Sequence, residues 1–338
     1  MKTRQLVVLA VLATVSVVAT AIVKRGGPTV VTTDRHGERV FQTVMDKAND
    51  ITGMTIRQGP GNDTIVIERG KIGFVEATSG FPVKTDAVRD LVASTIELTY
   101  DEARTSDPAR YYELGLTEPG EPYANQEITL RTAGGEIADF FVGHRETAVG
   151  GAVGGVFMRV KGQPQAWLVR GILRTPTIRA EWFDAFKFDV KREQIKKIEL
   201  IGGGREGVTV TTSADKPGEL TLENVPENRT ADSAKLTKLA APIEALAFRD
   251  VRKKTQAPDD PRRMVVDVDD GLKITITSVG DQLLDAWVQI AVEATSDAER
   301  EKASALTAKT EGYDFRLNYS QGEVVGWTSK ELTTEPKS

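Results

Sequence analysis

Residues 51–57 read ITGMTIR and residues 64–69 read TIVIER, with a glycine-rich turn between them. Apolar and polar side chains alternate along both segments, which is the period of a strand with one buried face. Two such segments around a turn predict a hairpin. The pattern returns later in the chain as IKKIELI (195–201), then Gly202-Gly203-Gly204, then VTVTTS (208–213). Two similar hairpins in one chain indicate an internal repeat.

An amphipathic helix is predicted after each hairpin. In the first copy, Thr85 or Asp86 caps a helix whose apolar face lies within 88–96. In the second copy, Asp232 precedes a helix with apolar residues spaced along 236–246. Both segments place apolar residues at i, i+3 and i+4, as a helix with one buried face requires.

A second hairpin follows each helix, with its turn at Gly134-Gly135 in the first copy and at Asp270-Gly271 in the second. Asp-Gly between alternating strands is a strong hairpin signal. The second copy also contains an extra charged helix over residues 297–309. The matching order predicts an α+β fold made of two similar antiparallel sheet-plus-helix units, a tandem repeat.

The N-terminus contains an uncharged apolar run, Leu6–Val23, between the basic pairs Lys2/Arg4 and Lys24/Arg25. Eighteen residues of helix span about 27 Å, close to the hydrocarbon thickness of about 30 Å. We expect a single N-terminal transmembrane helix, a signal anchor, followed by a break at Gly26-Gly27-Pro28. The expected domains are a membrane anchor (1–25), a first unit (26–190) and a second unit with a short C-terminal tail (191–338).

Two other interpretations of the run stay open. Ala19-Thr20-Ala21 fits the small-x-small pattern of a signal-peptide cleavage site, and a buried core helix is the third possibility. The basic residues balance at the two ends, but the short N-terminal tail favours an inside N-terminus. The expected location is the bacterial inner membrane, crossed once, with the body in the periplasm or otherwise outside the cytoplasm.

The overall composition argues against a nucleic-acid partner. The 338 residues have a formal net charge of −5, and the sequence pI is about 5.4. A nucleic-acid binder usually has a basic face and a high pI. The chain has no cysteine, which excludes disulfides, thiolate nucleophiles and thiolate zinc sites.

Several runs in the body have plain physical interpretations. Asp107 is a natural N-cap, Pro108 suits a first helical turn and Gly115 suits a C-cap. Aromatic side chains later in the first copy are expected in the core, namely Trp167, Trp182, Phe183 and Phe186.

Five short runs in the body resemble a known family. They are Asp107–Leu116 (DPARYYELGL), Val142–Arg145 (VGHR), Gln165–Val169 (QAWLV), Glu181–Asp184 (EWFD) and Phe188–Val190 (FDV). Their order and spacing, from about Thr43 to Leu332, resemble the bacterial domain-of-unknown-function family 4340 (DUF4340). The resemblance implies a membrane-tethered protein without an established activity. In this family, the genes often lie beside those of a gliding-type ABC exporter. No catalytic residues are known for the family, so none are transferred here.

Candidate catalytic and metal-binding residues are few. The two histidines, His36 and His144, are far apart in sequence and form no His-x-x-x-His pair. Asp267, Asp269, Asp270 and Gly271 resemble part of a calcium loop, but the glycine falls at position five instead of six. A strand and its turn explain these residues.

The glycine-rich segments are also expected to be structural. Gly150–Gly155 contains no Lys-Ser/Thr pair and precedes a strand, unlike a P-loop, and Gly202–Gly204 is a turn. No serine stands in a G-x-S-x-G elbow. We therefore assign no catalytic, cofactor-binding or metal-binding residues and expect no cofactor.

Three functions compete. The first is a non-enzymatic, extracytoplasmic accessory protein that binds a membrane complex, with an ABC exporter as the candidate partner. The second is an extracytoplasmic ligand-binding or sensing module with a pocket between the repeats. The third is a hydrolase that uses carboxylates, which two acidic groups with raised pKa in one cleft would favour.

Overall fold

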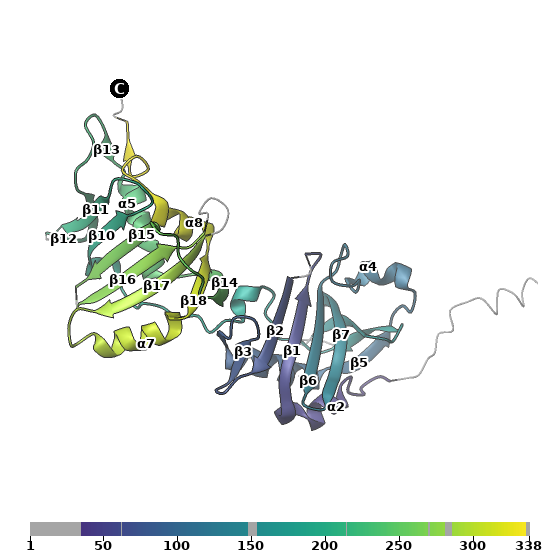
Figure 1. Ribbon diagram of the computed structural model, residues 1–338. Helices are drawn as coiled ribbons and strands as arrows, with labels where there is room; N and C mark the ends of the chain where they lie inside the picture. Colours follow the sequence, from purple (N-terminus) through teal and green to yellow (C-terminus); the bar gives the residue numbers. More distant parts are fainter. Residues whose placement is uncertain are drawn as a thin grey trace, which may run out of the picture. The chain divides into compact units, whose positions relative to one another are not determined.

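The computed structural model describes residues 35–61, 63–147, 154–213, 215–269, 271–280 and 286–335. These residues fold mainly into two large antiparallel sheets, one of nine strands and one of eight (Figure 1). The chain divides into two compact units. Unit 1 takes its described residues from Met1–Ile51, Ile56–Asp63 and Val92–Leu173, and unit 2 takes them from Thr52–Thr55, Thr64–Leu91 and Arg174–Ser338.

The first sheet has the strand order β4-β3-β2-β1-β6-β7-β8-β9-β5. Its strands are β1 (Ile51–Gln58), β2 (Asp63–Arg69), β3 (Phe74–Glu76), β4 (Pro82–Val83), β5 (Thr99–Ala103), β6 (Gln126–Thr132), β7 (Gly135–Glu146), β8 (Gly155–Val160) and β9 (Ala166–Arg170).

The second sheet has the strand order β12-β11-β10-β15-β16-β17-β18-β14. Its strands are β10 (Ile195–Ile201), β11 (Val208–Ser213), β12 (Lys216–Leu222), β14 (Phe248–Lys253), β15 (Arg263–Val268), β16 (Leu272–Ser278), β17 (Trp287–Ala294) and β18 (Tyr313–Leu317). A small ladder pairs β13 (Thr230–Ala231) with β19 (Thr333–Thr334).

Helices connect the strands. The α-helices are α2 (Gln42–Asp46), α3 (Thr85–Glu97), α4 (Tyr111–Leu114), α5 (Ser233–Leu239), α6 (Ala241–Glu244), α7 (Arg300–Thr310) and α8 (Tyr319–Gly322). Short 3-10 turns are η1 (Ala48–Asp50), η2 (Pro108–Arg110), η4 (Arg179–Glu181), η5 (Arg192–Gln194) and η6 (Glu323–Gly326).

The alternating sequence pattern produces the expected one-sided burial. Along β16, every second residue from Leu272 to Ser278 is buried, and β15 alternates in the same way. The buried face contributes to the core of unit 2, which also contains an aromatic group of Phe81, Phe183, Phe186, Phe248 and Phe315. The aromatic residues predicted for the core, Trp167, Trp182, Phe183 and Phe186, are all buried, which confirms that prediction.

The helices differ more from the sequence pattern than the strands do. Asp232 caps α5 as predicted, since its Oδ1 accepts hydrogen bonds from the backbone N–H groups of Ala234 and Lys235. The helix predicted through residue 246 instead breaks into α5 and α6, with Pro242 in the first turn of α6. The charged helix predicted over residues 297–309 is present as α7 and packs along β17 (Figure 1).

The predicted fold class needs correction. The described chain is mostly antiparallel sheet with few helices, because most of its alternating segments pair as strands. The predicted membrane helix, residues 6–23, lies outside the described residues. Among the described residues, no helix is both long and apolar enough to cross a membrane. The assignment of an N-terminal transmembrane helix and the inner-membrane, single-pass location are therefore withdrawn.

The two sheets share a connectivity. The order β3-β2-β1-β6-β7-β8-β9-β5 in the first sheet corresponds strand by strand to β12-β11-β10-β15-β16-β17-β18-β14 in the second. The helix α3 precedes β5 in the chain, and α5 and α6 precede the corresponding β14. The predicted domain boundaries, 26–190 and 191–338, stay a prediction.

Candidate functional site

A cluster of charged side chains crosses the first sheet. Glu127 on β6 is almost fully buried, with 1% of its side chain exposed. Its two oxygens accept hydrogen bonds from Arg57 Nη1 on β1 at 2.7 Å and from Lys161 Nζ, just after β8, at 2.6 Å. Lys161 Nζ also lies 3.2 Å from Asp139 Oδ2 on β7. A buried carboxylate with two cationic donors is well compensated.

Protonation in the cluster follows from burial and pairing. The hydrogen bond to Glu127 raises the pKa of Lys161, so the ammonium keeps its proton. Burial raises the pKa of Asp139, although Lys161 opposes the shift. Among the carboxyl groups of the described residues with a resolved shift, Asp139 alone has a raised pKa. The pair of such acids that would favour a hydrolase is not seen in this part of the chain.

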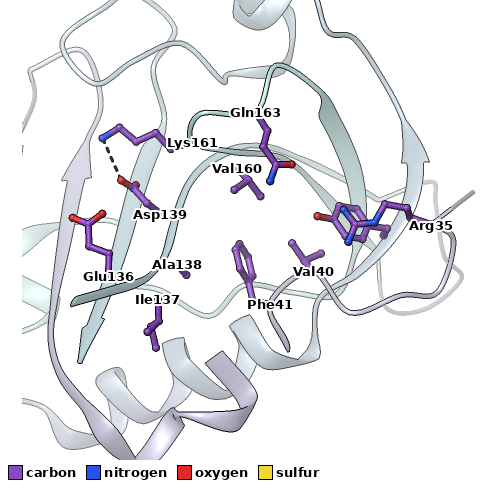
Figure 2. A pocket seen from close by; sticks show the side chains of 11 residues that line it. Arg35, Val40, Phe41, Glu136, Ile137, Ala138, Asp139, Val160, Lys161 and Gln163 are labelled. Carbon is purple, nitrogen blue, oxygen red and sulfur yellow. Dashed lines mark ion pairs between the residues drawn. The ribbon is translucent and has the colours of Figure 1, made fainter. Parts of the chain in front are cut away.

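A pocket of roughly 330 Å³ opens beside this cluster in unit 1. Figure 2 shows Asp139 joined to Lys161 on one side and Arg35 on the other, with Val40, Phe41 and Val160 between them. The guanidinium of Arg35 lies 3.9 Å from the ring centroid of Tyr100. The lining is more polar than that of a typical small-ligand pocket, and its volume is at the small end of the usual range.

A second feature of unit 1 is a pair of exposed tyrosines. Tyr112 on α4 is 49% exposed and Tyr123 is 66% exposed, yet their ring centroids are only 5.9 Å apart. Tyr123 has a φ of 64°, in the left-handed region that residues other than glycine rarely occupy. We call Tyr112 together with the loop 117–124 the tyrosine surface.

Hydrogen bonds hold the loop of the tyrosine surface in shape. Thr117 Oγ1 donates to the carbonyl of Pro122 at 2.8 Å. The N–H of Glu121 donates to the carbonyl of Glu118 at 2.9 Å, and the N–H of Ala124 to that of Glu121 at 3.2 Å. The unusual backbone of Tyr123 is therefore maintained by its surroundings, as strained positions require.

The helix α4 that carries Tyr112 is fixed as the sequence predicted. Asp107 caps the preceding turn by accepting from the N–H of Ala109 at 3.0 Å, and Gly115 ends the helix with a φ of 70°. The predictions for Asp107 and Gly115 are confirmed. A Cβ on Gly143 would lie 2.0 Å from the Leu114 carbonyl, so only glycine lets β7 approach α4 this closely.

Arg159 packs against the ring of Tyr111 on the same helix. Its guanidinium lies 4.5 Å from the centroid of Tyr111 and 4.1 Å from that of Phe141. Tyr111 also donates its hydroxyl hydrogen to the carbonyl of Pro164 at 2.6 Å. Tyr112 is therefore held in place by its neighbour on the helix, Tyr111, which is anchored in the core.

The structure places the two histidines in ordinary surroundings. His36 Nδ1 lies 3.2 Å from the Asp101 carbonyl and 3.3 Å from its carboxylate. His144 is exposed, with its ring against Gly115 at the end of α4. Within the described residues, no group of three or more His, Cys, Asp or Glu side chains could hold a metal ion.

The other sequence candidates are mostly structural. Asp267 belongs to a cross-strand ladder with Lys197 and Lys273. Asp270 and residues 150–153 lie outside the described residues. Gly202–Gly204 follow β10 as a turn, and Asp260 Oδ2 accepts from the N–H of Gly204 at 2.7 Å.

Sequence reasoning missed the pocket and the tyrosine surface. The pocket joins residues from positions 35 to 163, whose proximity depends on sheet order. For the tyrosine surface there was a local signal. Tyr112 stands next to the core residue Tyr111, so one of two adjacent helical aromatics had to face away from the core.

The comparisons with known proteins place the chain in a family. The family described as "Domain of unknown function (DUF4340)" matches residues 74–264, more than half of the chain. No curated protein and no solved structure matches the sequence significantly. The match agrees with the resemblance found in the runs from Asp107 to Val190. The chain belongs to the DUF4340 family.

Proposed function

We propose that this chain is a non-enzymatic interaction protein, an accessory subunit that binds another protein through the tyrosine surface. The observation that carries the proposal is the exposed pair Tyr112 and Tyr123, with ring centroids 5.9 Å apart. Tyrosine is enriched at the energetic centres of protein interfaces. Its side chain loses little conformational entropy on binding, and less still where the ring is already packed.

The candidate partner is a gliding-type ABC exporter. This part of the proposal rests on the family resemblance, by analogy with the gene neighbourhoods of relatives. We also propose that the chain arose by internal duplication, which the shared strand order of the two sheets supports.

A photo-crosslinking experiment tests the docking function. A photoreactive amino acid at the exposed position 109, three residues before Tyr112, should capture a partner from the native host. Tyr112→Ala with Tyr123→Ala should abolish the captured species. Tyr319→Ala is the matched control, because Tyr319 is 57% exposed but stands alone on α8. Capture that is unchanged in the double variant refutes docking through the tyrosine surface.

A second candidate function is a ligand-binding or sensing module. The pocket bounded by Arg35, Phe41 and Asp139 favours it. A thermal-shift screen of small metabolites should identify a stabilising ligand, and Val160→Trp should remove that effect by filling the pocket. If no stabilising metabolite depends on position 160, this candidate is rejected.

A further inference from the structure

We infer that the partner of the tyrosine surface presents a positively charged side chain, arginine or lysine, which binds against the rings of Tyr112 and Tyr123. The inference rests on the proposed docking function and specifies the chemistry of the partner. Aromatic faces carry negative electrostatic potential and attract cations, more strongly once water is removed. Two exposed rings at 5.9 Å offer such faces together.

The charges of the tyrosine surface favour the same partner. Its loop contains Glu118 and Glu121 and no lysine or arginine. The Glu118 side chain is 55% exposed and lies 3.9 Å from Arg159, whose side chain is only 10% exposed. Within the described part of the chain, Glu121 is exposed and has no ion-pair partner. Both carboxylates can therefore face an approaching cation.

Arg110, an exposed cation at the end of η2 directly before α4, does not reverse this balance. Arg110 pairs with Glu113 through Nη2 at 2.9 Å and Nε at 3.3 Å. That pair neutralises itself, and Arg159 partly offsets Glu118, so the unpaired Glu121 leaves the loop with a net negative charge. An anionic partner segment would meet carboxylates beside the rings, which disfavours it.

Within the described residues, arginine side chains of the chain lie over aromatic rings in seven contacts, three of them on tyrosine or tryptophan. Arg35 lies over Tyr100, Arg159 over Tyr111 and Arg252 over Trp287, at 3.9, 4.5 and 4.2 Å from the ring centroids. In each case an arginine of the chain itself covers the ring. Within the described residues, no such arginine is found over Tyr112 or Tyr123, so their faces remain accessible.

The test uses a labelled peptide, Gly-Arg-Gly-Ser-Arg-Gly, and measures its affinity for the full chain at low salt. The positions Tyr112 and Tyr123 are changed together to Phe, Trp or Leu. Cation–π binding predicts unchanged affinity for Phe, about twofold tighter binding for Trp and about fivefold or more weaker binding for Leu. Leu keeps an apolar side chain but removes the π face, and comparison with Phe, which is also apolar, separates cation binding from simple hydrophobic contact.

The carboxylates provide an independent readout. Glu118→Gln with Glu121→Gln should weaken the peptide about threefold and flatten the dependence of affinity on salt. Tyr319→Leu is the control and should change nothing. Circular dichroism and an unchanged melting temperature establish that each variant is folded.

Two results overturn the inference. One is a Leu variant that binds the arginine peptide as tightly as the unchanged chain. The other is a neutral proline-rich peptide, Gly-Pro-Pro-Ser-Pro-Gly, that binds more tightly than the arginine peptide and tolerates the Glu→Gln changes. If crosslinking still captures a partner that needs Tyr112 and Tyr123, docking stands and only the cationic chemistry is wrong.

Discussion

Eight strands of the first sheet follow the same order as the eight strands of the second, but the two sheets place charge differently. In the first, Glu127 is 1% exposed and holds both Arg57 and Lys161. In the second, Asp267 is 28% exposed and pairs with Lys197 and Lys273 on the solvent side. One topology therefore accommodates both a buried carboxylate and a surface ladder.

The connections differ as well. In the first sheet a short turn, residues 161–165, joins β8 to β9 and supplies Lys161 and Gln163 to the pocket. In the second sheet the corresponding connection between β17 and β18 contains α7. The pocket of Figure 2 thus depends on a short turn, whereas the corresponding connection of the second sheet contains a helix. Features that could carry function arise in the connections, while the strand order is kept.

Trp182 lies in neither charge cluster, so its replacement gives a reference value for the stability lost when a buried side chain is removed. Its side chain is fully buried, so Trp182→Ala should reduce the free energy of unfolding by about 3–5 kcal/mol. Trp182→Phe should cost clearly less, since the buried indole Nε1 has no hydrogen-bond partner within the described residues. Urea denaturation measures both. Equal losses would show that the indole nitrogen matters more than the volume.

The helices that precede β5 and β14 also differ between the two sheets. The helix α3 runs unbroken for 13 residues, whereas the corresponding segment before β14 forms two shorter helices, α5 and α6. Ala93→Pro removes a hydrogen bond inside α3 and should cost about 3 kcal/mol. Pro242→Ala removes no hydrogen bond, because a first-turn N–H has no intrahelical partner, but it trims a buried ring and should cost about 1–2 kcal/mol, less than Ala93→Pro. Thermal unfolding of the two variants gives the contrast. An equal loss for the two variants would show that the packing of Pro242 matters as much as the hydrogen bond inside α3.

The carboxylates sharpen the comparison. Glu127→Ala leaves Arg57 and Lys161 without their shared partner and should cost about 2–3 kcal/mol. Asp267→Ala removes a partly exposed ladder residue and should cost less than about 1 kcal/mol. Chemical denaturation at neutral pH compares them. Similar losses would mean that burial of Glu127 adds nothing to the energy of its ion pairs.

The sequence predicts the strands well and the sites poorly. Alternation along 51–57 and 195–201 predicts β1 and β10, because one-sided burial leaves a period of two in the sequence itself. The cap at Asp232 and the C-cap at Gly115 are local signals and are also confirmed. Core aromatics such as Trp182 follow from size and hydrophobicity alone.

The failures have a common cause. A helix through 246 was predicted from apolar spacing, although Pro242 interrupts the backbone hydrogen bonds. The pocket needs Arg35, Tyr100 and Asp139 to meet, which depends on strand pairing across distant parts of the chain. The exposure of Tyr123 depends on a loop whose hydrogen bonds leave no periodic pattern. Long-range pairing and irregular backbone are not encoded in local periodicity.

The smallest predicted effects concern pH, and they have opposite signs in two carboxyl groups. Burial raises the pKa of Asp139. Burial also acts on Glu76, but hydrogen bonds from Ser79, with help from Arg179, outweigh it and lower the pKa of Glu76. A raised pKa means that the folded state holds the proton more tightly than the unfolded state, and a lowered pKa means the reverse.

These two pKa shifts predict opposite dependences of the unfolding free energy on pH. As pH falls from about 7 towards about 4, the unchanged chain should gain stability relative to Asp139→Asn, because protonation relieves the burial of the Asp139 charge. Over the acid range below about pH 5, it should lose stability relative to Glu76→Gln, because Ser79 Oγ donates at 2.6 Å to a carboxylate that is being protonated. Unfolding free energies measured against pH for the three proteins give both differences. Curves of the same sign would show that Lys161, and not burial, controls the ionisation of Asp139.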